Sequence, residues 1–93
     1  MPLEYDLSDK LKEILRTLSK RDSKKVLIIN KKIKQIVNSD EFTIEHYKNL
    51  RHDLKDFKRA HIDKHFVLTF HYNKAKKFVF FVDYDHHDNV YRK

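Results

Sequence analysis

Histidine side chains are concentrated in the last third of the chain, where they and Arg59 alternate with apolar residues. Seven histidines occur in 93 residues, and five of them lie between His61 and His87. Histidine exchanges protons near neutral pH, and arginine binds a phosphate through two parallel hydrogen bonds. Such groups can cut RNA without a metal, because the reaction needs a base for the 2′-OH, an acid for the leaving 5′-oxygen and positive charge around the phosphate.

Three predicted strands carry these side chains. They cover residues 57–62, 65–72 and 77–84, and each is rich in β-branched and aromatic residues, as strands are. The third is apolar at both alternating sets of positions, which is typical of a central strand buried on both faces. Short connections between the three predict an antiparallel meander.

The alternation of side chains along a strand brings the candidate groups onto one face of the sheet. Arg59 and His61 share a face of the first of these strands, and His65 and His71 share a face of the second. His87 follows the third strand, and we expect it to reach the same face. The opposite face is apolar and needs a cover.

That cover is predicted from the first part of the chain. Residues 2–7 alternate like a short strand, and residues 8–20 have apolar side chains at helical spacing, with Ser8 as the N-cap. A second helix starts at Asp22 or Ser23 and ends at residues 38–40. The segment from Phe42 to Asp56 is predicted to be a connecting loop with apolar anchors.

The predicted fold class is therefore α+β, with two layers in a single domain spanning residues 1–93. A short N-terminal strand is followed by a helical hairpin and then by the three-stranded antiparallel meander. We expect the hairpin to cover the apolar face of the sheet and the first strand to join one edge.

Composition excludes several kinds of protein. The chain has no cysteine, so disulfides, cysteine-based zinc sites and thiol nucleophiles are excluded. It has no glycine, which argues against the phosphate-binding loops of nucleotide enzymes. No apolar run is long enough for a membrane span and no secretory signal opens the sequence, so a cytoplasmic location and no membrane contact are expected.

The net charge favours a polyanionic partner. Lysine and arginine number 21 against 14 acidic residues, a formal net charge of +7. A basic surface binds nucleic acid by releasing counterions from the phosphates, and it also attracts acidic proteins. Lys55, Lys58 and Lys64 lie in one of the denser basic segments, and we interpret them as contacts to an RNA backbone.

The acidic and histidine-rich run from Asp83 to Asp88 suggests a metal site as an alternative. Consecutive residues near a strand end point in different directions, so the whole run does not easily hold one ion. We therefore expect no metal and no other cofactor. The remaining alternative is a binding module that uses the basic face without catalysis.

Four segments of the second half resemble the RelE/ParE superfamily, the toxins of type II toxin–antitoxin systems. The resemblance covers nearly the whole chain, because family members also run strand, two helices and curved antiparallel sheet. The segments, in order, are Lys48-Asn49-Leu50, Arg59-Ala60-His61-Ile62, His65-Phe66-Val67-Leu68 and His87-Asp88-Asn89-Val90-Tyr91.

The chain also departs from the family pattern. His61 stands where many members have a second basic residue, and Phe66 replaces a frequent arginine. His87 replaces another arginine but is similar to the histidine of the YafQ-like branch, which also has a histidine at the place of His61. The resemblance thus implies a ribosome-dependent endoribonuclease that cuts mRNA. ParE-type members, which act on DNA gyrase, share the fold but lack the nuclease residues.

On this resemblance His87 is expected to be the acid or the acid/base of the reaction. His61 is expected to be the complementary base or a phosphate contact, and Arg59 to stabilise the charge on phosphorus. His65 is expected to orient a partner, and Tyr91 to stack on a base or bind a phosphate. The family also implies a RelB-like antitoxin, in a heterotetrameric complex, and the ribosome and mRNA as partners.

Overall fold

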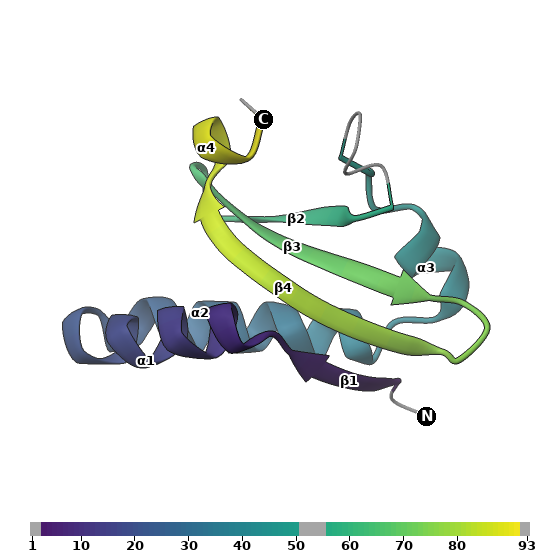
Figure 1. The fold of residues 1–93 in the computed structure, drawn as a ribbon, viewed down its shortest axis with the longest axis horizontal. Helices are drawn as coiled ribbons and strands as arrows, with labels where there is room; N and C mark the ends of the chain where they lie inside the picture. Colours follow the sequence, from purple (N-terminus) through teal and green to yellow (C-terminus); the bar gives the residue numbers. More distant parts are fainter. Residues whose placement is uncertain (1–2, 51–55, 92–93) are drawn as a thin grey trace.

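A computed structural model of the chain describes residues 3–50 and 56–91. Four strands and four helices make up this part of the chain (Figure 1). In chain order they are β1 (Glu4–Leu7), α1 (Asp9–Arg21), α2 (Ser23–Val37), α3 (Glu41–Glu45), β2 (Lys58–Ile62), β3 (Phe66–Asn73), β4 (Phe78–His86) and α4 (His87–Tyr91).

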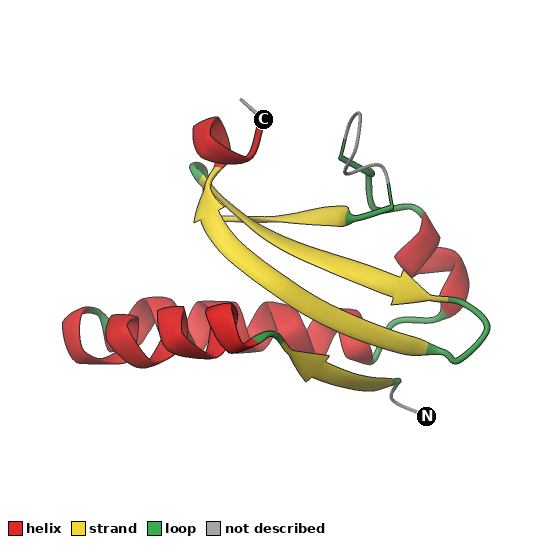
Figure 2. Cartoon of the chain, in the orientation of Figure 1, coloured by secondary structure: helices red, strands yellow, loops and turns green. Residues whose placement is uncertain are grey.

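The strands form one sheet in the order β1-β4-β3-β2. The last three strands pair antiparallel as a meander, and β1 joins the edge beside β4 in parallel. The helices α1 and α2 run together along one face of the curved sheet (Figure 2). The predicted α+β fold with two layers is therefore confirmed, as is the central position of β4.

Side chains at the helix starts explain why the hairpin begins where it does. The hydroxyl of Ser8 accepts a hydrogen bond from the backbone N–H of Leu11 at 3.0 Å. The carboxylate of Asp22 accepts one from the N–H of Lys25 at 3.2 Å, which lets α2 start two residues after α1 ends. Both are N-caps, which satisfy backbone donors left over in the first helical turn.

The core lies between the helical layer and the sheet. Ile29 and Ile36 of α2 are fully buried there, as are Phe70 of β3 and Phe81 of β4. Large apolar side chains from two layers thus exclude water between them, which is the main source of stability in a domain of this size.

A β-bulge at Val82 interrupts the ladder between β3 and β4. Phe70 pairs with Phe81, but Thr69 pairs with Asp83, so Val82 is one residue extra on β4. The carbonyl of Val82 instead accepts a hydrogen bond from the Ser8 hydroxyl at 2.6 Å. The bulge reverses which face the later residues of β4 occupy, and this reversal shapes the site described below.

Two short helices were not predicted from the sequence. Helix α3 occupies part of the expected loop, where the Asp40 carboxylate caps the N–H of Thr43 at 2.7 Å and Ile44 is fully buried. Helix α4 follows β4 directly and lies on the side of the sheet away from α1 and α2 (Figure 1). Helices of five residues contain too few turns for a hydrophobic period to be recognised.

The chain has no glycine, and two of its described residues adopt the left-handed backbone region instead. Asp63, in the turn between β2 and β3, and Lys77, in the turn between β3 and β4, both have φ of 52°. Aspartate tolerates this conformation better than most residues because its side chain bonds to nearby backbone. In the described part of the chain, no helix is both long and apolar enough to cross a membrane.

Candidate functional site

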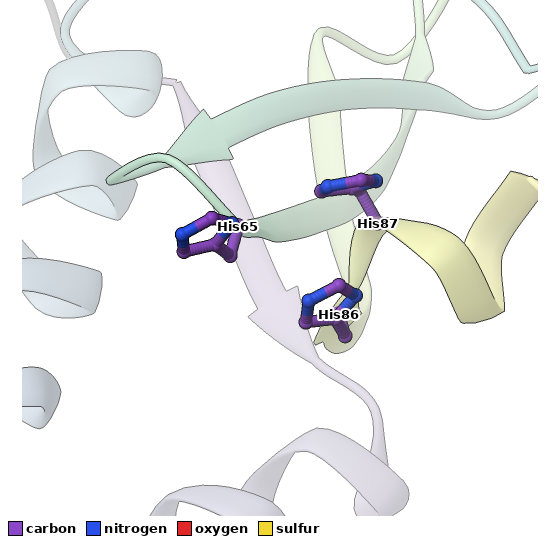
Figure 3. A group of neighbouring side chains, drawn as sticks. All are labelled: His65, His86 and His87. Atoms are coloured by element: carbon purple, nitrogen blue, oxygen red, sulfur yellow. The ribbon is translucent and has the colours of Figure 1, made fainter.

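Three histidines come together at the end of the sheet where β3 begins and β4 ends (Figure 3). Each of His65, His86 and His87 offers a ring nitrogen, and the three nitrogens lie within 4.8 Å of one another. The ring centroids of His86 and His87 are 4.7 Å apart, and His65 stacks on His86 at 5.9 Å. We call this group the histidine cluster.

Strand pairing brings the members of the histidine cluster together. Phe66, the first residue of β3, pairs with His86, the last residue of β4. The backbone N–H of His87 then donates to the carbonyl of His65 at 2.8 Å, which extends the pairing by one step. Because the chain turns from strand into helix between His86 and His87, these neighbours do not point to opposite faces as they would in a continued strand.

Asp88 orients two of the three rings. Its Oδ1 lies 3.0 Å from Nδ1 of His87, and its Oδ2 lies 3.6 Å from Nδ1 of His86. The backbone N–H of Asp88 also donates to Nδ1 of His86 at 3.1 Å. A carboxylate beside Nδ1 of His87 favours the proton on that nitrogen, so Nε2 is the nitrogen suited to exchange a proton or to bind an ion.

The turn before β3 holds His65 in place. The carboxylate of Asp63 accepts the backbone N–H of His65 at 2.9 Å, and the ammonium of Lys25 reaches the same carboxylate at 3.2 Å. The bond from the His65 N–H lowers the pKa of Asp63, and Lys25 adds to this against the opposing effect of burial. Lys25 also lies over the ring of Phe66 at 4.2 Å, so α2 is tied to the turn that carries His65.

Arg59 and His61 lie on β2, outside the histidine cluster. Both belong to the face of the sheet opposite α1 and α2, and His61 is near the same end of the sheet as the cluster. Across β2, β3 and β4, Arg59 pairs with Thr69, which pairs with Asp83. In the same way His61 pairs with Val67, which pairs with Asp85. The bulge therefore puts two carboxylates on the face that we expected to gather arginine and histidine.

Part of this face of the sheet is buried. Val67 is fully buried on it and Thr69 is 6% exposed. A cavity of about 140 Å³ lies there between the sheet, α4 and the segment before β2. It is lined by Leu50, Phe57, Thr69, Val82, Asp83, Asp85, Asn89 and Val90. Val90 of α4, which is half-buried, and the buried Leu50 thus cover part of this face, which the strand pattern alone did not indicate.

The remaining residues predicted for the site lie in α4, in the turn between β2 and β3, and outside the described residues. Tyr91 is the last residue of α4, and Lys64 is exposed in the turn between β2 and β3. Lys55 lies outside the described residues. Sequence reasoning missed His86 as a neighbour of His65; the only available signal was its place in the acidic and histidine-rich run that suggested a metal site.

The ammonium group of Lys58 is hydrogen-bonded within the protein. Its ammonium donates to the carbonyls of Glu45 and Tyr47 at 3.3 and 3.1 Å, and to the side chain of Asn49 at 3.0 Å. These bonds join the end of α3 to β2. Its role in RNA binding stays a prediction, and any phosphate contact competes with three acceptors already present.

We expect Lys58→Ala to lower the free energy of unfolding by about 1–3 kcal/mol, since hydrogen bonds from a charged donor are lost. Urea unfolding followed by circular dichroism measures this effect. Lys64→Ala removes the same charge from an exposed turn and is the matched control, with a change of about 0.5 kcal/mol or less. Equal stability of the two variants would contradict the structural role of Lys58.

Comparison with known proteins places the chain among toxins. It is 52% identical over 90 residues to a Methanocaldococcus jannaschii protein named "Putative toxin RelE4", covering 97% of this chain and 92% of that protein. A Methanosarcina mazei protein, named only as an uncharacterized protein, is 40% identical over 74 residues, or 80% of this chain and 81% of that one. No protein-family model matches the chain.

The fold also matches a solved structure. A chain of the toxin–antitoxin complex RelBE2 from Mycobacterium tuberculosis superposes with a TM-score of 0.62, covering 92% of this chain and 99% of that chain. At 17% sequence identity this likeness concerns the fold alone. The high identity to the archaeal relative over nearly its full length carries the assignment: the chain belongs to the RelE superfamily and is a RelE-type toxin.

Proposed function

We propose that this toxin is a ribosome-dependent endoribonuclease that cleaves mRNA by metal-independent acid/base chemistry, as the toxin of a type II toxin–antitoxin system. The observation that supports it most is the position of His87. This histidine begins a helix directly after the central strand, with its ring beside a carboxylate and two further histidines. It lies at the end of the sheet that Arg59 and His61 approach from β2.

In this proposal His87 donates the proton to the leaving 5′-oxygen. Asp88 Oδ1, 3.0 Å from Nδ1, orients the ring and leaves Nε2 as the donating nitrogen. The His87 side chain is 35% exposed, which allows both contact with an RNA strand and exchange of protons with water. His65 stacks near it at 6.3 Å and helps to orient it.

The other roles fall to side chains of β2 and of the neighbouring turns. His61 is exposed and acts as the complementary base or as a phosphate contact. Arg59 stabilises charge that develops on the phosphate, as a positioned guanidinium does. Tyr91 stacks on a base or binds a phosphate. Lys64, Lys58 and Lys55 contact the RNA or ribosomal backbone.

The partner that restrains the toxin is a RelB-like antitoxin in a heterotetramer. Two features support a protein partner: Leu27 and Ile28 on α2 are 69% and 47% exposed, and the full sequence carries a formal charge of +7. Exposed apolar side chains on a helix, amid lysines, suit an amphipathic segment with acidic residues. The RelBE2 structure, as a toxin–antitoxin complex, is a precedent for such pairing on this fold.

The test is a cleavage time course on ribosomes programmed with mRNA. Attack by the 2′-OH leaves a 2′,3′-cyclic phosphate or a 3′-phosphate on one product and a 5′-hydroxyl on the other, and EDTA does not slow it. Without ribosomes we expect cleavage to be much slower. Products with a 5′-phosphate would point to a hydrolytic reaction, and binding to ribosomes without cleavage would make the protein a non-catalytic toxin.

A further inference from the structure

We propose that the histidine cluster binds a divalent transition metal such as Zn²⁺, and that the bound metal inhibits the toxin. The claim that the cluster binds a metal stands on the geometry of His65, His86 and His87 alone. The claim that the metal inhibits the toxin rests on the proposed function, because it assumes that His87 takes part in cleavage.

The geometry is close to that of a three-histidine metal site. Nitrogen ligands lie 2.0–2.1 Å from Zn²⁺, so two ligands of a tetrahedral ion are about 3.3 Å apart. In the cluster all three nitrogens already lie within 4.8 Å of one another. Rotations about the side-chain bonds of His65, which is exposed, and of the half-buried His86 and His87 suffice to close the difference. This is the one such group of histidine and acidic side chains found in residues 3–50 and 56–91.

The surroundings favour binding through Nε2 of His87. A histidine that ligates a metal usually donates its other ring N–H to a carboxylate, which fixes the ring and increases its basicity. Asp88 already stands in that position, 3.0 Å from Nδ1 of His87. His86 Nδ1 accepts the backbone N–H of Asp88 at 3.1 Å, so binding through Nε2 of His86 requires this bond to break.

The donor set selects the class of ion. Imidazole nitrogens suit Zn²⁺, Cu²⁺ and Ni²⁺, whereas Mg²⁺ and Ca²⁺ prefer oxygen ligands. Three histidines leave a fourth position of a tetrahedral ion for water, and the Asp88 carboxylate partly offsets the positive charge of the chain near the ion. The backbone bond from His87 N–H to the His65 carbonyl holds two of the ligands together before any metal arrives.

Binding of the metal withdraws the Nε2 lone pair of His87. A nitrogen coordinated to a metal neither carries nor accepts a proton, so His87 cannot then act as an acid or a base. The expected result is a nuclease that is insensitive to EDTA but sensitive to added Zn²⁺. This distinguishes an inhibitory site from a catalytic metal, which EDTA would remove with loss of activity.

The binding half is tested by titrating the purified protein with Zn²⁺ in a calorimeter and with Co²⁺ by its visible absorption, which is intense only in four-coordinate sites. We expect one ion per chain, and at least about 10-fold weaker binding in His86→Gln, since even second-shell changes cost 10–100-fold. His46→Gln is the matched control, because His46 is exposed at the C-terminal end of α3 and its Nδ1 bonds to the nearby carbonyl of Phe42 at 2.8 Å. Equal affinity of His86→Gln and the unchanged protein, or equal loss in His46→Gln, would overturn the site.

The inhibition half is tested in the ribosome assay. Each protein is compared with its own metal-free rate, and His86→Gln should keep that rate at a Zn²⁺ concentration that stops the unchanged toxin. Equal inhibition of both proteins, or stimulation by Zn²⁺, would overturn the inhibitory role. Because the titration requires no nuclease activity, a failure of the proposed function would leave the binding result readable.

Discussion

Replacing His87 with glutamine is expected to lower cleavage of ribosome-bound mRNA by about 10²-fold or more, the usual contribution of a general acid or base. Glutamine is similar in size but cannot exchange a proton near neutral pH. The side chain is 35% exposed at the junction of β4 and α4, so the fold should persist. Binding to the ribosome should be largely retained, because one histidine adds little to a polyelectrolyte contact.

Single-turnover cleavage on programmed ribosomes measures this effect, and a sedimentation assay measures ribosome binding. His46→Gln provides a matched control at an exposed position, and it should cleave at the normal rate. Circular dichroism and thermal unfolding establish that both variants fold. Near-normal cleavage by a folded His87→Gln protein would remove His87 from the mechanism.

Replacing Phe70 with alanine is expected to lower the free energy of unfolding by about 3–5 kcal/mol. Phe70 is fully buried in β3, where its ring packs against Tyr47 at 5.5 Å and Phe81 at 5.8 Å between centroids. Truncation leaves a cavity between the sheet and its cover. A chain of this length has a total stability of roughly 5–14 kcal/mol, so a large part of it would be lost.

Urea unfolding at a single temperature, with the midpoint and slope fitted for each protein, measures the difference. Phe42→Ala is the matched control, because Phe42 is 71% exposed and its ring contacts His46 at the surface. A surface truncation of this kind changes stability by about 0.5 kcal/mol or less. If Phe70→Ala were as stable as Phe42→Ala, the two-layer core described above would be incorrect.

The amino-acid sequence alone was enough to predict the main elements and their class. Helical spacing of apolar residues, with Ser8 and Asp22 as caps, defined the two long helices to within a residue or two. β-branched and aromatic runs defined the strands of the meander. These signals are local, because burial on one face imposes a fixed period on each helix and strand.

The sequence also indicated where chemistry could occur, but it did not indicate which side chains meet. Arg59 and His61 lie on the predicted strand, whereas the partners of His87 are His65 and His86, and its proximity to His61 is still a prediction. Divergence of neighbouring side chains along a strand argues against a metal site in the run from Asp83 to Asp88. The end of β4 at His86 removes that objection, since the chain turns into α4 at the next residue.

Only the tertiary structure decided the face on which the last residues of β4 lie. Regular alternation would place Asp83 on the same side as Phe81, but the extra residue Val82 reverses it. The carbonyl of Val82 finds its donor in Ser8, 74 residues earlier in the chain. The physical reason is that the carbonyl which this bulge leaves out of the ladder is satisfied by a group far away in the chain, and no local pattern contains that information.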